Sequence, residues 1–346
     1  MRSEKSKAIK IKKRETELTR NFLIKNNLIR NDLKIYRNDK FIYIPIKEVN
    51  KIVNDFEIVD INFEKRKKKI NSYKNYLLDL KDLNIKLPKS YDVIGNIILI
   101  RLSDELGELQ YKIGDSLLKS HKNIKTVCCI KPVSGEFRTR NLTIIAGNNN
   151  TKTLHNEFGL KYYLDIDKVY FSPRLANERK RISNFVKKDE VIVDMFAGIG
   201  PFSIMIAKYS NPKKIYLVDK NKYAIKYARK NIIINNVLEK IVTLNIDAKY
   251  IMRYLKDIMA NRIIMNLPFS AFKYFEKALK IAANNVVIHY YDILKNDNID
   301  NRINELRYIA EKNGFNIEHF KINKIKSYSP HEFYMGIDIT AKRMPT

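Results

Sequence analysis

One segment near the middle of the chain combines an acid with two glycines in a pattern typical of a ligand site. The apolar run Val191–Val193 ends at Asp194, and a turn containing Gly198 and Gly200 follows before an apolar helical pattern begins. Open α/β sheets bind nucleotide-like ligands with a strand, a glycine-rich turn and a helix in this order. Glycine lets the backbone approach a ligand closely and adopt turn angles that a side chain forbids. The segment 191–203 is therefore the first candidate binding site.

The residue types of this turn favour S-adenosylmethionine (SAM) as the ligand. A dinucleotide fingerprint has a third glycine where this chain has Ser203, and it places pyrophosphate on the helix N-terminus. Asp194 would repel pyrophosphate, but it suits a ligand with a cationic amino-acid end. SAM carries an ammonium and a sulfonium and no phosphate. NAD and a purely structural turn are the alternatives.

Three later polar residues also follow apolar strand patterns. Asp219 can accept hydrogen bonds from both ribose hydroxyls of an adenosine, and Asp247 can accept from the adenine amine. Asn266, followed by Leu267 and the rigid Pro268, presents an amide to the edge of a flat nitrogen heterocycle. Ligands of such sheets lie at the carboxyl ends of the strands. Acids end three successive strand patterns, at Asp194, Asp219 and Asp247. This regularity argues against ordinary solvated loop carboxylates.

Strands and helices that alternate from residue 190 onward are expected to position these side chains. Alternation of this kind predicts a parallel, doubly wound sheet. The strand patterns 317–325 and 333–341 close the chain as a hairpin, which puts an antiparallel strand on the sheet. In the segment before the apolar strand Val191–Val193, Ser172-Pro173 predicts a helix start, with serine as N-cap and proline at the first helical position. The fold class is α/β, of the class I SAM-methyltransferase type.

The chain divides into four predicted regions. Residues 1–64 form a small α+β domain rich in Lys and Arg, which is either a nucleic-acid docking module or a structural cap. Residues 65–86 are a charged linker, and residues 87–180 are an α/β middle domain packed on the catalytic domain. Residues 181–346 are the SAM-binding domain.

The net charge of the chain is +28, with 66 Lys and Arg against 38 Asp and Glu. Such an excess predicts a polyanionic partner, most plausibly nucleic acid, although a Lys-rich solvated surface is the alternative. The adjacent Cys128 and Cys129 indicate a reduced, intracellular protein, since neighbours rarely form a disulfide. No apolar run reaches membrane-spanning length, so we expect a cytoplasmic protein with no membrane partner. His155 and His289 have no partners at metal-ligand spacing, and no metal is expected.

Five segments carry a more specific signal than a glycine-rich turn does. They are Gly135-Glu-Phe-Arg-Thr-Arg140, Tyr170-Phe-Ser-Pro-Arg174 with Glu178-Arg179, Asp194-Met-Phe-Ala-Gly-Ile-Gly-Pro-Phe202, Asn266-Leu-Pro268 and His289-Tyr-Tyr291. Together they resemble the archaeal–eukaryal tRNA (guanine-37-N1)-methyltransferase family over nearly the whole chain. The resemblance implies methyl transfer from SAM to N1 of the guanosine 3′ of the anticodon. It also implies tRNA as partner, contacted at the anticodon stem-loop and at the outer corner, and we expect a monomer.

The resemblance also implies roles for individual residues. Glu178 matches the general base that removes the N1 proton, Arg138 the residue that stabilises charge on O6, Asn266 the residue that holds the base edge, and Tyr170 a residue of the target pocket. The residues that match SAM-contacting positions or form the glycine-rich SAM motif are Arg179, Asp194, Phe196, Gly198, Gly200, Asp219, Lys220, Asp247, Ala248, Asn266 and Pro268. These roles agree with the chemistry, because N1 of neutral guanine has no available lone pair and needs a base and an electrophile at O6.

Some alternatives stay open at this point. Glu178 could form an ion pair on a helix surface with Arg179 or Arg181, and Arg138 and Arg140 could bind phosphate. Phe269 stands where relatives commonly have Lys, which puts base orientation and product scope in doubt. Rival functions are a wyosine-pathway enzyme, which methylates a tricyclic guanosine derivative or transfers the aminocarboxypropyl arm of SAM, and a non-catalytic tRNA-binding protein with a vestigial SAM fold.

Overall fold

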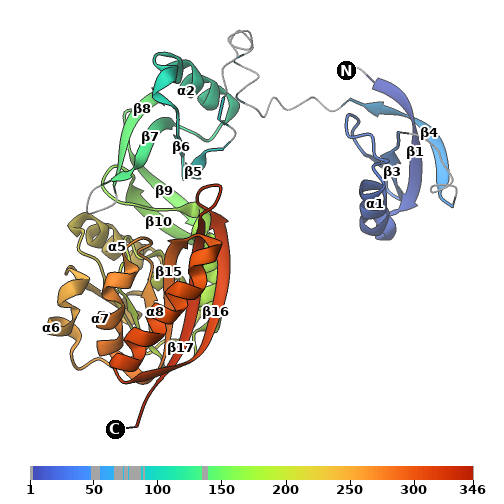
Figure 1. Ribbon diagram of the computed structural model, residues 1–346. Coiled ribbons are helices and arrows are strands. Elements are labelled where there is room, and N and C mark those ends of the chain that lie inside the picture. The colour runs from blue at the N-terminus through green and yellow to red at the C-terminus, as the bar shows by residue number, and fades with distance from the viewer. Residues whose placement is uncertain are drawn as a thin grey trace. The chain divides into compact units, whose positions relative to one another are not determined.

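The computed structural model describes residues 3–47, 55–65, 73, 77, 87–88, 90–134 and 139–345. Contacts divide the chain into two compact units, 1–72 and 73–346, which are described separately below (Figure 1). Among the described residues, no helix has both the length and the apolar character needed to cross a bilayer.

The first unit is a small sheet with one helix against it. Its four strands lie in the order β2 (Tyr36–Arg37), β3 (Phe41–Pro45), β1 (Ser3–Lys12) and β4 (Glu57–Glu64), and α1 spans Thr16–Lys25. The strand β1 is antiparallel to both β3 and β4. Its inward residues Ile9 and Ile11 pack with Leu23 of α1, while lysines alternate with them. This α+β module matches the architecture predicted for the N-terminal region.

A seven-stranded mixed sheet forms the core of the second unit (Figure 1). In spatial order its strands are β13 (Ile241–Leu244), β12 (Lys214–Val218), β11 (Val191–Asp194), β14 (Ala260–Met265), β15 (Ala282–Leu294), β17 (Phe333–Arg343) and β16 (Phe315–Ser327). The first five strands in this order, from β13 to β15, are each parallel to their neighbours. The strand β17 is antiparallel to both β15 and β16. The predicted α/β class with an antiparallel strand near one edge is confirmed.

Helices cover the two faces of this sheet and bury its apolar side chains. They are α3 (Ala176–Phe185), α4 (Pro201–Tyr209), α5 (Lys222–Ile234), α6 (Ile251–Leu255), α7 (Phe275–Lys280) and α8 (Ile299–Lys312). In Figure 1, α8 lies along the strands β15–β17, and it packs against β16. Strands buried on both faces read as continuous apolar runs, as Val191–Val193 and Ile263–Met265 do.

A four-stranded sheet and a hairpin complete the second unit. The sheet has the order β5 (Asp92–Ile94), β6 (Ile97–Ile100), β7 (Thr126–Ser134) and β8 (Thr139–Gly147), and α2 (Leu109–Ser120) packs on it. The hairpin is formed by β9 (Lys152–Glu157) and β10 (Leu160–Asp165). Side chains of Asn231 and Asn235 on α5 accept hydrogen bonds from backbone N–H groups of β10, at 2.7 and 2.9 Å. One apolar cluster continues from β5–β7 through this hairpin to α4 and α5.

Two local features differ from the sequence-based expectation. Ser172 is extended, as an N-cap should be, but its side chain makes no capping hydrogen bond, and Pro173 starts a 3₁₀ turn, Pro173–Leu175, before α3 begins at Ala176. The Ser172 carbonyl instead accepts a hydrogen bond from Arg179. Tyr73 and Leu77, which fall in the predicted linker 65–86, are buried in the cluster with α2. The other limits of the four regions stay predictions.

Candidate functional site

A cavity of about 360 Å³ opens at the carboxyl ends of the parallel strands. Its walls come from the segments after β11, β12, β13 and β14, together with the start of α3 and the start of β17. The lining includes Tyr170, Phe171, Arg179, Met195, Phe196, Gly198, Asp219, Lys220, Asp247, Ala248, Asn266, Leu267, Pro268, Tyr274 and Tyr334. Most of the sequence-predicted site residues therefore meet in one cavity. Three described ones, Glu178, Asp194 and Gly200, are not among its lining residues.

The glycine-rich turn is anchored at both sides by backbone hydrogen bonds. Met195 donates its N–H to Ile264 of β14, and Ala197 donates to Val218 of β12, so the turn spans the tops of two neighbouring strands. Gly198 has φ 57° and faces the cavity. Gly200 has φ 83°, and a Cβ there would lie 2.8 Å from a methyl of Leu217. The two glycines therefore serve different purposes, Gly198 at the cavity wall and Gly200 in the packing beneath it.

Asp219 and Asp247 line the cavity from adjacent strands. The Asp219 carboxylate accepts the N–H groups of Gly198 and Asn221, at 2.7 and 2.8 Å, which fixes both oxygens beside the turn. Burial raises the pKa of Asp219, and these two N–H groups oppose that shift. Asp247 caps the following turn by accepting the N–H of Lys249 at 2.9 Å. Carboxylates held in this way offer remaining lone pairs to ligand hydroxyl and amine donors.

An apolar part of the cavity lies beside these acids. The rings of Phe196 and Tyr274 meet edge to face with centroids 5.0 Å apart, and Ala248 and Leu267 add aliphatic surface. Aromatic and aliphatic walls with a few fixed polar groups are the usual construction of a site for a flat heterocycle. The residues present therefore fit an adenosine moiety.

Asp194 directly precedes Met195, which lines the cavity, but it is not a lining residue itself. Its side chain is fully buried, and Oδ2 accepts a hydrogen bond from the Ser203 hydroxyl at 2.8 Å, while Oδ1 has no partner among the described residues. Burial raises the pKa of Asp194 to about 7. A direct contact of this carboxylate with the cationic end of a ligand stays a prediction.

Arg179 is a buried cation that joins α3 to the hairpin. Its guanidinium donates to both oxygens of Glu157, at 2.8 and 2.5 Å, and to the Ser172 carbonyl at 3.1 Å. Only 1% of the residue is exposed, yet it borders the cavity. A buried guanidinium needs such a bidentate partner, because an unpaired charge in the interior is strongly unfavourable.

Asn266 and Tyr334 form the wall next to the end of β14. The Tyr334 hydroxyl donates to Oδ1 of Asn266, which leaves the amide NH₂ as the donor end of this side chain. Tyr170 lines the same cavity from the segment before α3. The Tyr334 ring lies against the Tyr291 ring, with centroids 6.1 Å apart. Tyr291 in turn connects this wall to Glu178.

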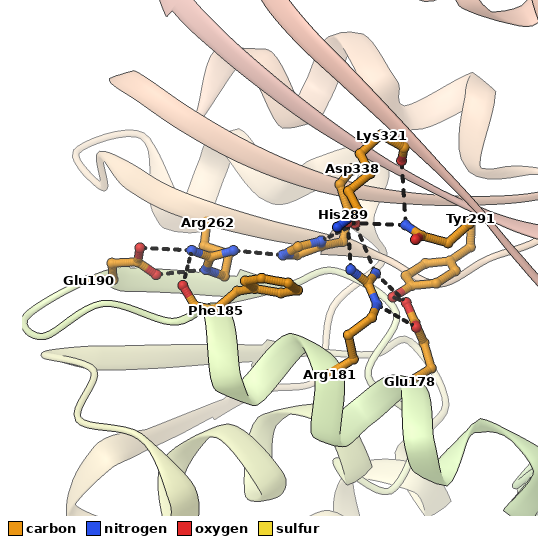
Figure 2. Close-up of polar contacts among 10 residues, drawn as sticks. Glu178, Arg181, Phe185, Glu190, Arg262, His289, Tyr291, Lys321 and Asp338 are labelled. Carbon is orange, nitrogen blue, oxygen red and sulfur yellow. Dashed lines mark hydrogen bonds and ion pairs between the residues drawn. The ribbon is translucent and has the colours of Figure 1, made fainter.

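Glu178 is buried and forms three hydrogen bonds (Figure 2). Arg181 donates Nε to Oε2 at 2.8 Å and Nη2 to Oε1 at 2.7 Å, and the Tyr291 hydroxyl donates to Oε1 at 2.7 Å. Burial raises the pKa of Tyr291 well above its usual value, and the charge of Glu178 adds to this effect, so the phenol stays a donor. The ion pair with Arg181 that the sequence suggested does form, but the Glu178 side chain is buried and that of Arg181 is half-buried, so the pair does not lie on an exposed helix surface.

Arg181 is shared between two carboxylates. It also donates to Asp338 of β17, at 2.6 and 3.1 Å, and Asp338 accepts from Nδ1 of His289 at 2.7 Å. Burial opposes ionisation of Asp338, but the hydrogen bonds from His289 and Arg181 hold its pKa well below the usual value. The chain continues on the other ring nitrogen of His289, which lies 2.7 Å from Arg262, itself paired with Glu190 at 2.7 and 2.9 Å (Figure 2).

Several residues of this site were missed by sequence reasoning. Tyr334, Asp338 and Glu157 lie on strands whose patterns showed only burial and alternation, and nothing local signals their partners. The spacing of Arg181 three residues after Glu178 was the one available signal. Arg138, predicted to stabilise charge on O6, lies outside the described residues.

Comparison with known proteins identifies the chain's relatives. Residues 153–318 match the TRM5/TYW2 methyltransferase domain, residues 77–151 the TYW2 N-terminal domain and residues 8–54 the tRNA methyltransferase 5 N-terminal domain. The chain is 38% identical over 333 residues to the tRNA (guanine(37)-N(1))-methyltransferase Trm5b of Pyrococcus abyssi, which covers 96% of this chain and 98% of the relative. It is 39% identical to Trm5b of Methanocaldococcus jannaschii, with 95% and 97% covered.

Two further relatives bear on the function. A solved complex of aTrm5 with tRNALeu superposes with a TM-score of 0.67 at 38% identity, covering 96% of this chain and 99% of that one. The tRNA(Phe) (4-demethylwyosine(37)-C(7)) aminocarboxypropyltransferase of Methanocaldococcus jannaschii is 33% identical, but its alignment spans 98% of that protein and only 73% of this chain. On these similarities, the chain belongs to the TRM5/TYW2 methyltransferase family.

Proposed function

We propose that this protein transfers the methyl group of SAM to N1 of guanosine 37 in tRNA. The observation that carries the proposal is the full-length similarity to two Trm5b enzymes, combined with the cavity between Asp219, Asp247 and Asn266. The cofactor of the family is SAM, and the described cavity residues fit its adenosine part. When bound, SAM supplies an electrophilic methyl group on its sulfonium.

Aminocarboxypropyl transfer is the alternative with a specific relative behind it. That relative aligns with nearly its whole length but leaves about a quarter of this chain uncovered. Residues 8–54 of this chain also match the tRNA methyltransferase 5 N-terminal domain. This additional module favours methylation of guanosine 37 over the wyosine-pathway reaction.

Glu178 is the proposed general base for the N1 proton of guanine. Its carboxylate has about four acceptor positions, and Arg181 and Tyr291 occupy three of them, two on Oε1 and one on Oε2. The remaining position on Oε2 is the one we assign to the proton of N1. Protonation of Glu178 does not leave the half-buried guanidinium of Arg181 without a counter-charge, because Asp338 still neutralises it. Two carboxylates around one guanidinium therefore let one of them take up a proton.

The other catalytic residues act on the guanine edge. We assign Arg138 to the charge that develops on O6 as N1 loses its proton, and Tyr170 to the wall of the target pocket. The amide NH₂ of Asn266 would donate to an acceptor on the base, O6 or N7, since its oxygen already accepts from Tyr334. A base and electrophilic stabilisation of O6 together meet the requirement of N1 methylation.

Binding of tRNA is proposed to involve two regions. The N-terminal module, in which lysines alternate with buried residues along Ser3–Lys12, is assigned to the outer corner. The second unit is assigned to the anticodon stem-loop, from which guanosine 37 must leave the stack to reach the cavity. We propose that the protein acts as a monomer.

Incubation with SAM and tRNA transcripts tests the reaction. Transcripts carrying G or A at position 37 would be treated with the protein, digested and analysed by nucleoside mass spectrometry. We expect 1-methylguanosine from the G37 transcript alone. An aminocarboxypropyl product would move the assignment to the wyosine pathway, and tight tRNA binding without product from either transcript would favour a binding protein.

A further inference from the structure

Phe269 is an exposed aromatic residue at the edge of the cavity. It stands between Pro268 and Ser270, both of which line the cavity, while its own ring is 53% exposed and is not among the lining residues. Its φ is 73°, a left-handed conformation that bulky side chains rarely adopt. Large apolar side chains are normally buried, and strained backbone occurs preferentially at functional sites. A ring held outward in this way beside a ligand cavity therefore points to a contact with something outside the protein.

Hydrogen bonds on both sides hold the unusual backbone in place. The N–H of Phe269 donates to Oδ1 of the buried Asp292 at 3.3 Å. The N–H groups of Ser270 and Ala271 donate to the Leu267 carbonyl, at 3.0 and 2.8 Å. The ring is thus presented from a fixed turn, and its placement follows from the turn and not from apolar packing.

Tyr328 forms a pair with Phe269 across the edge of the sheet. The ring centroids are 5.3 Å apart with the planes at 75°, and Tyr328 is 48% exposed. An edge-to-face contact covers at most one of the four ring faces. Phe269 follows the end of β14, and Tyr328 lies in the loop between β16 and β17, where the N–H of Tyr328 donates to the Glu332 carbonyl at 2.8 Å. Both rings therefore lie at the carboxyl edge that holds the cavity.

Two basic side chains of β16, the strand that ends just before Tyr328, lie over aromatic rings of β17. Lys324 is exposed and its Nζ contacts the Phe333 ring, and Lys326 lies over the ring of Tyr334, the cavity residue that donates to Asn266. Aromatic faces that alternate with cationic side chains are the surface that binds single-stranded nucleic acid, since every base has a π-face and every nucleotide a phosphate. A protein partner would offer no such reason for the combination.

We propose that Phe269 and Tyr328 form a stacking platform for an unpaired base of the RNA loop next to the target guanosine. The platform would hold the neighbour at position 36 or 38 while guanosine 37 enters the cavity. This inference rests on the proposed function for its choice of RNA, and it makes Phe269 a substrate-positioning residue.

Fluorescence of a modified anticodon stem-loop tests the platform. RNA hairpins with 2-aminopurine at position 36 or 38 would be titrated with the wild-type protein and with Phe269→Leu, Phe269→Gly and Phe269→Tyr. Stacking is expected to quench one of the two probes in the wild type and in Phe269→Tyr. Loss of the ring should remove that quenching and weaken stem-loop binding roughly 5- to 150-fold, the equivalent of one lost base–aromatic stack. Glycine accepts the positive φ, so a loss shared by Leu and Gly cannot be assigned to backbone strain.

Tyr308→Leu is the matched control, because Tyr308 is a 57% exposed aromatic on α8 of the same unit. It should leave binding and quenching unchanged, and SAM affinity should be unchanged in the Phe269 variants, because the ring does not line the cavity. Binding and quenching within twofold of wild type in both Phe269→Leu and Phe269→Gly would overturn the platform. Formation of 1-methylguanosine by the wild type reports on the proposed function separately, so either idea can fail alone.

Discussion

Glu178 and Asp194 are both buried carboxylates, but their surroundings differ in kind. Arg181 and Tyr291 together give Glu178 three donors, whereas Asp194 has the Ser203 hydroxyl and an oxygen without a partner among the described residues. Burial raises the pKa of Asp194 to about 7, and only Ser203 opposes this shift by donating to the carboxylate. The two carboxylates thus have different surroundings, and each can be tested by its amide analogue.

Glu178→Gln should abolish the proton transfer and leave the fold intact. Glutamine keeps an oxygen acceptor for Arg181 and Tyr291 but cannot act as a base at neutral pH, so the single-turnover methylation rate should fall by about 10²- to 10⁴-fold. Affinity for tRNA, measured by filter binding, should stay within a few-fold. Glu305→Gln, an exposed acid on α8, serves as control. An equal loss of tRNA binding would mean that Glu178 is structural.

Asp194→Asn should change the pH dependence of stability. The folded-state pKa of about 7 lies above the usual value of an aspartate, so the unfolded chain loses this proton first as the pH rises. Stability is therefore lost progressively between about pH 4 and pH 7, at up to about 1.4 kcal/mol per pH unit. The variant has no carboxyl group at this position and lacks this loss. Its free energy of unfolding in urea, relative to that of the wild type, should therefore increase as the pH rises from 4.5 to 8. A difference in free energy of unfolding that stays constant with pH would contradict the raised pKa of Asp194.

At the scale of elements, the site depends on turns and strands that meet at one edge of the sheet. The turn after β11 is fixed to β12 and β14, and α3 is fixed to β17 through Arg181 and Asp338. Each of these connections can be weakened without removing a proposed catalytic group. A change at Gly200 tests the shape of the turn, and a change at Asp338 tests the charge around Glu178, the proposed base.

Gly200→Ala should disturb the turn through a steric contact. A Cβ at Gly200 would lie 2.8 Å from a Leu217 methyl, whereas a Cβ at Gly314, with a similar φ of 76°, would meet nothing within 4 Å. Both substitutions carry the left-handed backbone cost of roughly 1–2 kcal/mol, so their difference isolates the clash. We expect a lower melting temperature and weaker SAM binding by calorimetry for Gly200→Ala than for Gly314→Ala. Equal effects would exclude the packing role.

Asp338→Asn should slow methylation without removing the proposed base. The groups that face this carboxylate are Arg181, His289 and Asn323, and without its charge the guanidinium of Arg181 acts on Glu178 alone. Transfer of a proton to Glu178 would then leave that guanidinium without a carboxylate, so the single-turnover methylation rate should fall although the proposed base is still present. A role limited to stability would lower the yield of folded protein and leave the single-turnover rate of the folded fraction as it is in the wild type.

At the scale of the whole molecule, the charge of +28 should dominate tRNA affinity. Neutralisation of phosphates releases counterions, and an interface with 6–10 phosphate contacts loses about 10³- to 10⁵-fold in affinity between 50 and 200 mM salt. We expect a loss of this size in filter binding, with SAM affinity nearly constant over the same range. A tRNA affinity that changes less than threefold would mean that the basic residues form a solvated surface and do not contact phosphates.

The sequence alone determined the sheet and the chain's class. Apolar strand runs that end in Asp194, Asp219, Asp247 and Asn266 are local signals, and the terminal hairpin follows from period-two alternation. Because parallel strands bring their carboxyl ends to one edge, the meeting of Asp219, Asp247 and Asn266 in one cavity could be predicted. The N-cap predicted at Ser172 did not form, because Pro173 begins a 3₁₀ turn and α3 starts only at Ala176.

Only the tertiary structure decided which partners surround the reacting groups. Asp338 lies 157 residues after Arg181 in the chain, and Tyr334 lies 68 residues after Asn266, so no spacing rule connects them. They meet because β17 is inserted antiparallel between β15 and β16. This position brings the side chain of Asp338 to α3 and that of Tyr334 to the end of β14. Sequence patterns record periodicity and burial, whereas the charged groups around Glu178 are brought together only by the order of the strands.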